Sequence, residues 1–322
     1  MRVVVTGGSG FIGSAFLWKL NKEGINDILV VDVGKGNRNS PNIRGKKIAG
    51  YVEHDEFLRL INSDKLDKNI DMIVHLGACA DTTETDKGYL NDNNYLYSKS
   101  LAEWSLKNDK LFFYASSAAT YGAGELGYSD EDRLIPSLKP LNEYGRSKQR
   151  FDLWLLENTL TERIVGFKFF NVYGPNEYHK QDMRSMVNKG YYQIKESGKL
   201  RLFKSYKPEY LHGGQKRDFI YIKDALEVMW YFMNNPDKKG IFNVGTGRAH
   251  TWNELAIALF KALDKEPNIE YFDMPENIKD QYQYFTQADL SKLRSAGCGY
   301  QFTGINDAVK DYVSYLEKGE YL

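Results

Sequence analysis

The chain has 322 residues, 42% of them hydrophobic, so it is long enough to bury one large core or two modest ones. Lys plus Arg and Asp plus Glu balance at 43 each, which leaves no basic excess for nucleic acid or an anionic membrane. No apolar run approaches the roughly 18 residues of a membrane span, and the first strand begins without a cleavable leader pattern. We therefore expect a cytoplasmic protein. The two cysteines and five histidines show no ligand spacing, so no metal is expected.

Short apolar runs rich in β-branched residues alternate with segments of helical period, which is typical of βαβ units in a parallel sheet. Helices are predicted to begin at Ser14, Glu56, Asn94 and Tyr144. The predicted strands are Val3–Val5, Ile28–Val31, Ile70–Leu76, Leu111–Tyr114 and Ile164–Phe170. We predict an α/β fold of the Rossmann type, a doubly wound parallel sheet.

The pattern changes after Gly174-Pro175, where a loop-like stretch over residues 176–182 precedes a helix. A smaller C-terminal α/β region is predicted to contain strands 200–203 and 269–272 and helices 252–263 and 305–316. We expect residues 1–171 to bind a dinucleotide and residues 172–322 mainly to bind substrate, with some segments returning to the first domain.

The first strand leads into the glycine-rich run Thr6-Gly7-Gly8-Ser9-Gly10-Phe11-Ile12-Gly13. Such a turn lets the backbone approach a pyrophosphate and directs free helix N–H groups at it. Asp32 stands 19 residues after Gly13, where an acid accepts hydrogen bonds from the adenosine ribose. A tight structural turn is the alternative.

Lys35, Arg38 and Arg44 follow the acid and suit a 2′-phosphate, although basic residues in a surface loop are usually just solvated. The sequence thus favours NADP, with NAD as the alternative.

The small residues of His75-Leu76-Gly77-Ala78-Cys79 let the chain pass close beneath a nucleotide. Cys79 is interpreted as a packing residue because nothing in the sequence marks a base partner for it. His75, at the end of an apolar strand, is interpreted as an interior histidine.

Tyr144 and Lys148 are four residues apart, so they share one face of a helix. An ammonium near a phenol favours the phenolate, which predicts that the pKa of Tyr144 falls from about 10 toward working pH. Ser117, after the fifth strand, supplies a hydroxyl for the reacting oxygen, and its neighbour Ser116 is the competing candidate.

The glycine run, Ser117, Tyr144 and Lys148, in this order and spacing, resemble the extended short-chain dehydrogenase/reductases. Later blocks also match the nucleotide-sugar enzymes of that group. These blocks are 170–175 (FNVYGP), 217–221 (RDFIY) with Asp224, and 242–247 (FNVGTG). Ser117-Ala118-Ala119 stands where related 4,6-dehydratases carry Thr-Asp-Glu, so dehydration is disfavoured.

Several segments are similar to the subfamily of epimerases that act on ADP-glyceromanno-heptose. These segments are 77–84, 92–95, 115–122, 171–183 and 282–290. The resemblance implies a redox-neutral inversion at C6″ through a transient ketone, with Tyr144 and Lys180 as two bases on opposite faces of the sugar. It also implies a homo-oligomer and a role in the lipopolysaccharide inner core. Without the resemblance, Lys180 is an ordinary exposed charge.

The same matching implies two sets of contacts. The cofactor set is Gly7, Gly10, Phe11, Ile12, Gly13, Asp32, Val33, Arg38, Leu76, Gly77, Ala78, Cys79, Ala80, Asn93, Lys148 and Val172. The substrate set is Ser117, Asn171, Asp182, Lys189, Phe203, Ser205, Arg217 and Tyr282. Arg217 is expected to clamp the diphosphate, and its alternative is a structural salt bridge.

Two residues depart from the family pattern. Lys168 stands where arginine is usual, and Val33 replaces an asparagine after Asp32, which weakens the preference for NADP. The stretch over residues 206–215 also exceeds the expected length. A UDP- or GDP-sugar 4-epimerase or a reductase of the same fold is the alternative enzyme, and a non-catalytic dinucleotide sensor is the alternative of another class.

Overall fold

The computed structural model describes residues 1–34, 39–279 and 282–322. Its central element is a seven-stranded sheet of order β10-β6-β5-β4-β1-β2-β3 in which every neighbouring pair is parallel. The strands are β1 (Val3–Thr6), β2 (Ile28–Asp32), β3 (Gly50–Glu53), β4 (Met72–His75), β5 (Leu111–Ser117), β6 (Val165–Phe169) and β10 (Gly240–Val244). The predicted fold class is confirmed.

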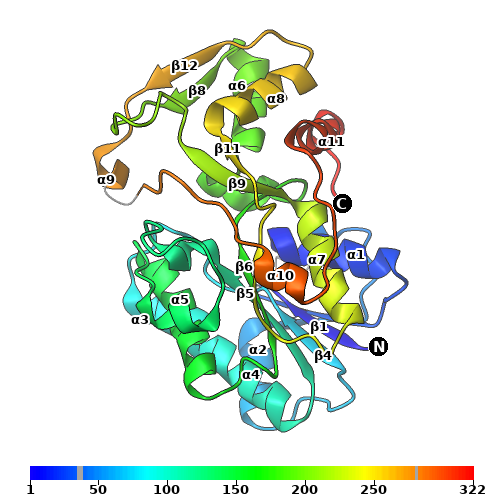
Figure 1. Cartoon of the computed structure of the whole chain (residues 1–322). Coiled ribbons are helices and arrows are strands. Elements are labelled where there is room, and N and C mark those ends of the chain that lie inside the picture. Colours follow the sequence, from blue (N-terminus) through cyan, green and yellow to red (C-terminus); the bar gives the residue numbers. More distant parts are fainter. Residues whose placement is uncertain (35–38, 280–281) are drawn as a thin grey trace.

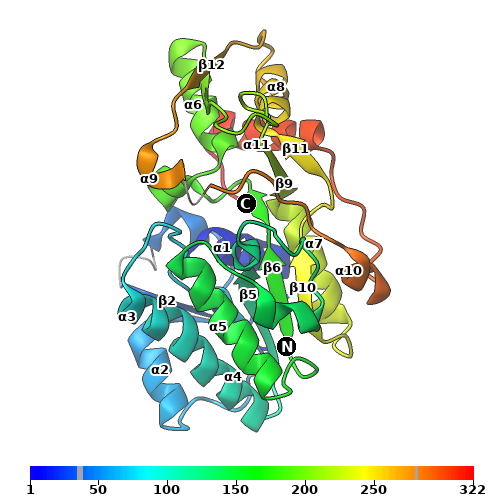
Figure 2. The same ribbon diagram turned by 60° about the vertical axis from the view of Figure 1, so that its left-hand side comes forward.

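Helices cover both faces of this sheet (Figures 1 and 2). On one face are α2 (His54–Asn62), α4 (Tyr97–Lys107) and α5 (Glu143–Glu157), and on the other are α1 (Phe11–Lys22) and α7 (Ile222–Asn234). The alternation of strand side chains decides this division: Val3 and Val5 pack with α1 and α7, whereas Val4 packs with α2, α4 and α5.

The chain order reverses between β1 and β4, because β2 and β3 extend the sheet in one direction while β5, β6 and β10 extend it in the other. In open α/β sheets, ligands bind at the carboxyl ends of the strands beside such a switch point. The glycine-rich run follows β1, and the segment 76–80 follows β4, so both lie at this place.

A smaller layer lies over the carboxyl edge of the large sheet (Figure 1). It contains the parallel pair β8 (Leu200–Phe203) and β12 (Ile269–Phe272), with α6 (Met186–Ser197), α8 (Trp252–Ala262) and α11 (Ile305–Lys318) packed together. A three-stranded sheet, β11-β9-β7, joins the layers. Its strands are β7 (Asn171–Tyr173), β9 (Lys216–Tyr221) and β11 (Ala249–Thr251).

The remaining helices are short: α3 (Lys87–Leu90), α9 (Glu276–Lys279) and α10 (Ser291–Ser295). A π-helical segment, Asn91–Leu96, continues α3 into α4, and 3₁₀ turns cover Pro41–Ile43, Ala118–Tyr121, Asp132–Ser137 and Tyr178–Met183. Strand β10 lies in the large sheet although it comes from the second half of the chain. Among the described residues, no helix is long and apolar enough to cross a membrane.

Candidate active site

The glycine run forms a tight cradle between β1 and α1. Gly7 adopts a φ of +66°, and a Cβ there would lie 2.6 Å from the backbone nitrogen of Gly77. A Cβ on Gly13 would lie 2.0 Å from the carbonyl oxygen of Gly7. A side chain is thereby excluded at each of these two positions, and the turn leads into α1, whose N-cap is Gly10. The first turn of α1 keeps N–H groups for an anionic ligand, so the cradle fits the pyrophosphate of a dinucleotide.

Asp32 ends β2 beside this cradle. Its Oδ2 accepts a hydrogen bond from the Ser9 amide at 2.7 Å, and its Oδ1 accepts one from the Val33 amide at 2.8 Å. The acid is therefore fixed against the glycine turn, at the place expected for a ribose contact. Arg44 is exposed, whereas Lys35 and Arg38 lie outside the described residues.

Hydrogen bonds through Asn94 connect the segment after β4 to the π-helical segment Asn91–Leu96 and to α5. Asn94 accepts a hydrogen bond from the Cys79 amide at 2.8 Å and donates to the Cys79 carbonyl and to Ser147 Oγ, both at 2.9 Å. The last residue of β4, His75, is buried, and its two ring nitrogens contact Thr6 Oγ1 and Ser98 Oγ. Burial lowers the pKa of His75, and the interpretation of an interior histidine is confirmed.

Two adjacent cavities open along this edge, of about 480 Å³ and about 330 Å³. The larger is lined by predicted catalytic and substrate residues: Ser117, Tyr144, Lys148, Asn171, Lys180, Lys189, Phe203 and Tyr282. The smaller is lined by predicted cofactor residues: Gly7, Gly10, Phe11, Ile12, Gly13, Asp32, Val33, Leu76, Gly77, Ala78, Cys79, Ala80 and Asn93. Phe11, Ile12, Leu76, Ala78, Ala80, Ala115 and Lys180 line both, and Val172 lines the larger.

Helix α5 positions Tyr144 and Lys148 along the larger cavity. Asn142 caps the helix by accepting a hydrogen bond from the Gly145 amide at 2.8 Å, so Tyr144 sits in its first turn. Ser117 lies beside the Tyr144 phenol and lowers its pKa, whereas Ser116 Oγ donates to buried Asp152 at 2.8 Å. Of the two serine candidates, Ser117 is thus the one that faces the phenol.

The predicted effect of Lys148 on the pKa of Tyr144 is wrong for this structure. Burial raises the pKa of Tyr144, and the Ser117 hydrogen bond offsets only part of that rise. Lys148 Nζ instead donates to the carbonyl oxygen of Ala115 at 3.0 Å. Burial lowers the pKa of Lys148 to about 8, against opposing contributions from Asp152 and Cys79. The effect of burial on these pKa values outweighs that of the charge interaction between the two residues. Burial depends on the surrounding chain and cannot be read from residue spacing in the sequence.

Lys180 is carried by the 3₁₀ turn Tyr178–Met183, which a buried carboxylate holds in place. Glu177 accepts hydrogen bonds from the Ser185 amide at 2.6 Å, the Ser185 hydroxyl at 2.5 Å and the Gly174 amide at 3.4 Å. Gln181 has a φ of +47° and a ψ of −120°, a costly backbone conformation beside the lysine. Burial lowers the pKa of Lys180, while the charge of Glu177 raises it.

Arg217 lies on β9 and is only 6% exposed. Its guanidinium carbon lies 5.0 Å from the Tyr282 ring centroid and 6.0 Å from that of Trp252, and Nη1 donates to the Lys216 carbonyl. No carboxylate of the described residues forms an ion pair with it. The alternative role of Arg217, a structural salt bridge, is therefore absent among the described residues. The arginine lies behind the rings of Tyr282 and Trp252, which line the larger cavity.

Three predicted residues of the described chain line neither cavity. These are Arg217, Asp182, whose carbonyl accepts a hydrogen bond from Lys189 Nζ at 3.1 Å, and Ser205, whose hydroxyl donates to the Lys207 carbonyl. Conversely, the larger cavity is lined by residues that motif matching missed, including Met186, Val187, Trp252, Leu255 and Gln283. Trp252 follows Thr251, and the Thr251–Glu254 capping box marks the start of α8 in the sequence, but no local pattern shows which face meets the cavity.

Fold and site together define a dinucleotide-binding enzyme with the serine, tyrosine and lysine of a short-chain dehydrogenase/reductase. The chain belongs to the NAD dependent epimerase/dehydratase family, whose model matches residues 3–245.

Curated relatives named ADP-L-glycero-D-manno-heptose-6-epimerase match along nearly the full length. The protein from Nitratidesulfovibrio vulgaris (strain DP4) is 52% identical over 310 residues, covering 96% of each chain. The one from Fusobacterium nucleatum is 44% identical over 326 residues, covering 98% of each. The resemblance stated from the sequence is confirmed.

Solved structures show the same fold. The ADP-L-glycero-D-manno-heptose-6-epimerase of Helicobacter pylori aligns with a TM-score of 0.79 at 26% identity, over 98% of this chain and 96% of that one. The UDP-glucose 4-epimerase of Thermus thermophilus in complex with NAD aligns with a TM-score of 0.77 at 23% identity, over 99% and 100%. This second likeness concerns the fold alone.

Proposed function

We propose that the enzyme inverts C6″ of ADP-D-glycero-D-manno-heptose to give ADP-L-glycero-D-manno-heptose. The observation that carries the proposal is that Tyr144 and Lys180, from separate segments of the chain, line one cavity together with Ser117 and Lys148. An inversion needs a proton donor or acceptor on each face of the reacting carbon, and one tyrosine alone serves a single face. The names and full-length identity of the relatives support the choice of substrate.

In this proposal Tyr144 and Lys180 exchange the proton of the C6″ oxygen, one for each epimer. Bound nicotinamide supplies reversible hydride transfer at the carbon. Ser117 hydrogen-bonds the reacting oxygen, and Lys148 orients the nicotinamide ribose. Because burial lowers the pKa of Lys180, this lysine releases its proton more readily than a solvated lysine does. The ketone must present both faces to the same site, which a cavity of about 480 Å³ gives room to do.

We further propose that residues 1–171 bind the cofactor and residues 172–322 mainly bind the nucleotide sugar, with Arg217 opposite the diphosphate. NADP is the proposed cofactor because Lys35, Arg38 and Arg44 follow Asp32; NAD is the alternative that Asp32 favours. Titration of cofactor-free protein with NADP⁺ and NAD⁺ separates the two. A homo-oligomer, as the family resemblance implies, is tested by light scattering.

The function is tested by incubating purified protein, without added cofactor, with ADP-D-glycero-D-manno-heptose and following C6″ stereochemistry by NMR. We expect an approach to a mixture of both epimers with no net consumption of reduced cofactor. A parallel reaction with UDP-galactose tests the alternative 4-epimerase. Unchanged heptose together with converted galactose would reject the proposal in favour of that alternative, and stoichiometric consumption of NADPH would indicate a reductase.

A further inference from the structure

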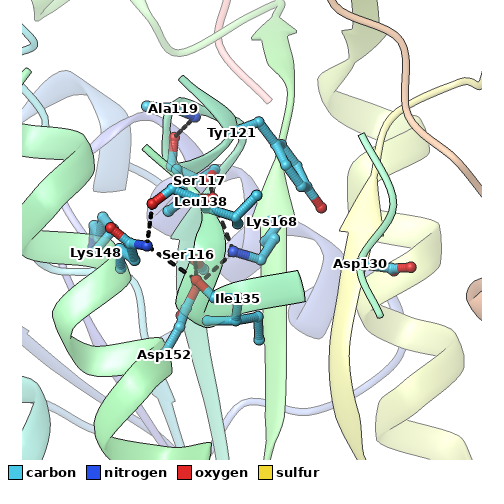
Figure 3. A network of polar contacts seen from close by, with 12 residues as sticks. Ser116, Ser117, Ala119, Tyr121, Asp130, Ile135, Leu138, Lys148, Asp152 and Lys168 are labelled. Atoms are coloured by element: carbon cyan, nitrogen blue, oxygen red, sulfur yellow. Dashed lines mark hydrogen bonds and ion pairs between the residues drawn. The ribbon is translucent and has the colours of Figure 1, made fainter. Parts of the chain in front are cut away.

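A buried ion pair lies beneath the strand that carries Ser117 (Figure 3). Asp152 on α5 accepts a hydrogen bond from Lys168 Nζ on β6 at 2.6 Å, and both side chains are 0% exposed. The carboxylate also accepts hydrogen bonds from Tyr114 Oη at 2.7 Å and Ser116 Oγ at 2.8 Å, both on β5. One carboxylate thus joins a helix and two strands next to the candidate active site.

The pair continues in one direction toward Ser117. Lys168 Nζ also contacts Thr120 Oγ1 at 2.8 Å, and Thr120 Oγ1 donates to the Ser117 carbonyl at 2.8 Å. Because an ammonium only donates, the threonine hydroxyl accepts from the lysine and directs its own proton at that carbonyl. Lys168 therefore fixes the turn Ala118–Tyr121, and with it the backbone of Ser117.

The other end of the pair acts on Lys148. Asp152 follows Lys148 by one helical turn on α5, and its charge opposes the burial that lowers the pKa of the lysine. Neither Asp152 nor Lys168 lines the two cavities. The pair therefore touches the supports of Ser117 and Lys148 without reaching the space where substrate and cofactor would lie.

A fully buried ion pair is a poor source of stability, because removing two charges from water costs about as much as their attraction returns. Replacing a buried ion pair by apolar side chains of similar volume is often neutral in folding free energy. We propose that Lys168 and Asp152 are positioning residues, which hold Ser117 and Lys148 in register for proton transfer in the proposed epimerase. This inference rests on the proposed function.

The chain of contacts from Lys168 through Thr120 to Ser117 is tested most selectively by a substitution at Thr120. Thr120→Val keeps the side-chain shape and leaves both residues of the ion pair in place, but it removes the hydrogen bond to the Ser117 carbonyl together with the acceptor for Lys168 Nζ. We expect kcat to fall about 10-fold or more with KM within about 2-fold, because an interaction serving the transition state is lost while substrate binding is kept. Thr120→Ser retains the hydroxyl and should restore kcat.

Thr303→Val is the matched control. It is the same substitution at a hydroxyl that donates to Asp224 at 2.7 Å, in the segment before α11. Wild-type kcat is expected for this variant. A kcat loss shared by Thr303→Val would reduce the effect at Thr120 to general destabilisation and overturn the proposal.

Coupling is tested with Lys168→Met/Asp152→Asn, which removes both charges of the pair together. Adding Thr120→Val to this double variant should lower kcat by a smaller factor than it does in wild type, because Lys168 no longer holds the threonine hydroxyl against the Ser117 carbonyl. If the kcat losses of Thr120→Val and of the double variant multiply in the triple variant, the residues act independently and the proposed chain of contacts is contradicted.

Amide hydrogen exchange over residues 115–122 provides a readout that needs no turnover. Exchange should accelerate in Thr120→Val and stay unchanged in Thr303→Val. If the wild-type protein converts no heptose, the proposed function fails while this measurement still decides the positioning role. Wild-type exchange and wild-type kcat in Thr120→Val would refute the positioning role by itself.

Discussion

The ammonium of Lys180 lies 5.4 Å from the centroid of the Phe11 ring, the first residue of α1 after the glycine cradle. Both residues line the two cavities, so the lysine stands where the proposed cofactor and substrate sites meet. A cation over an aromatic face is attracted by the ring quadrupole, which helps to hold the ammonium in place. This contact joins the second half of the chain to the dinucleotide turn.

Lys180→Met should therefore lower kcat for epimerisation by about 10²-fold or more, the range of general acid–base catalysis. Tyr144→Phe should cause a loss of similar size, because each residue serves one face of the carbon. The measurement is the rate of C6″ inversion by NMR. Lys199→Met, at a half-exposed lysine on the smaller layer, is the control and should retain wild-type rates. Full activity of Lys180→Met would leave only a one-base mechanism.

Lys148 should make the free energy of unfolding depend on pH. Its pKa is about 8 in the folded protein and 10.5 without burial, so the unfolded chain binds more protons between these values. The destabilisation from burying the lysine is full below about pH 8 and disappears as pH rises toward 10.5. Stability contributed by this group thus increases by about 3 kcal/mol across the window. Denaturant titrations of wild type and Lys148→Met, compared pH by pH, isolate the slope from other groups; equal slopes would contradict the lowered pKa.

Arg217→Lys should weaken substrate binding more than it slows turnover. Lysine keeps the charge but loses the planar fork that engages two phosphate oxygens, and hydrogen bonds to charged groups contribute about 1.5–3 kcal/mol. We expect KM to rise about 10-fold or more with kcat nearly unchanged. Arg201→Lys on β8 is the control, since that arginine is exposed. A fall in kcat with an unchanged KM would place Arg217 away from the diphosphate.

Gly13→Ala should remove dinucleotide binding, because its Cβ would lie 2.0 Å from the Gly7 carbonyl oxygen and force the cradle open. The amount of nicotinamide that copurifies with the protein, measured after denaturation, should fall to background. Gly299→Ala is the matched control, since its Cβ would meet nothing within 4 Å. Retention of cofactor by Gly13→Ala would show that the cradle is not the pyrophosphate site.

Much of the fold is predictable because it depends on patterns of apolar and polar residues that are close together in the sequence. The apolar strands and the helices between them define a parallel sheet, and the structure confirms it. Strand β3 was not predicted: all four of its residues are half-buried at the sheet edge, and Gly50 and Glu53 give it no apolar run. The predicted strand Ile70–Leu76 shortens to Met72–His75, although the Asp71 and Leu76 amides still bond the carbonyls of Arg2 and Thr6.

The sequence by itself determined the glycine turn, the acid after β2 and the helical spacing of Tyr144 and Lys148, since each is a local relation along the chain. Tertiary structure alone decided that Lys148 bonds the Ala115 carbonyl and that Lys180 reaches Phe11, and it supports the choice of Ser117 over Ser116 that the sequence had favoured. It also decided the pKa directions of these groups. Desolvation and charge depend on which distant segments pack around a side chain, and no spacing within one segment contains that information.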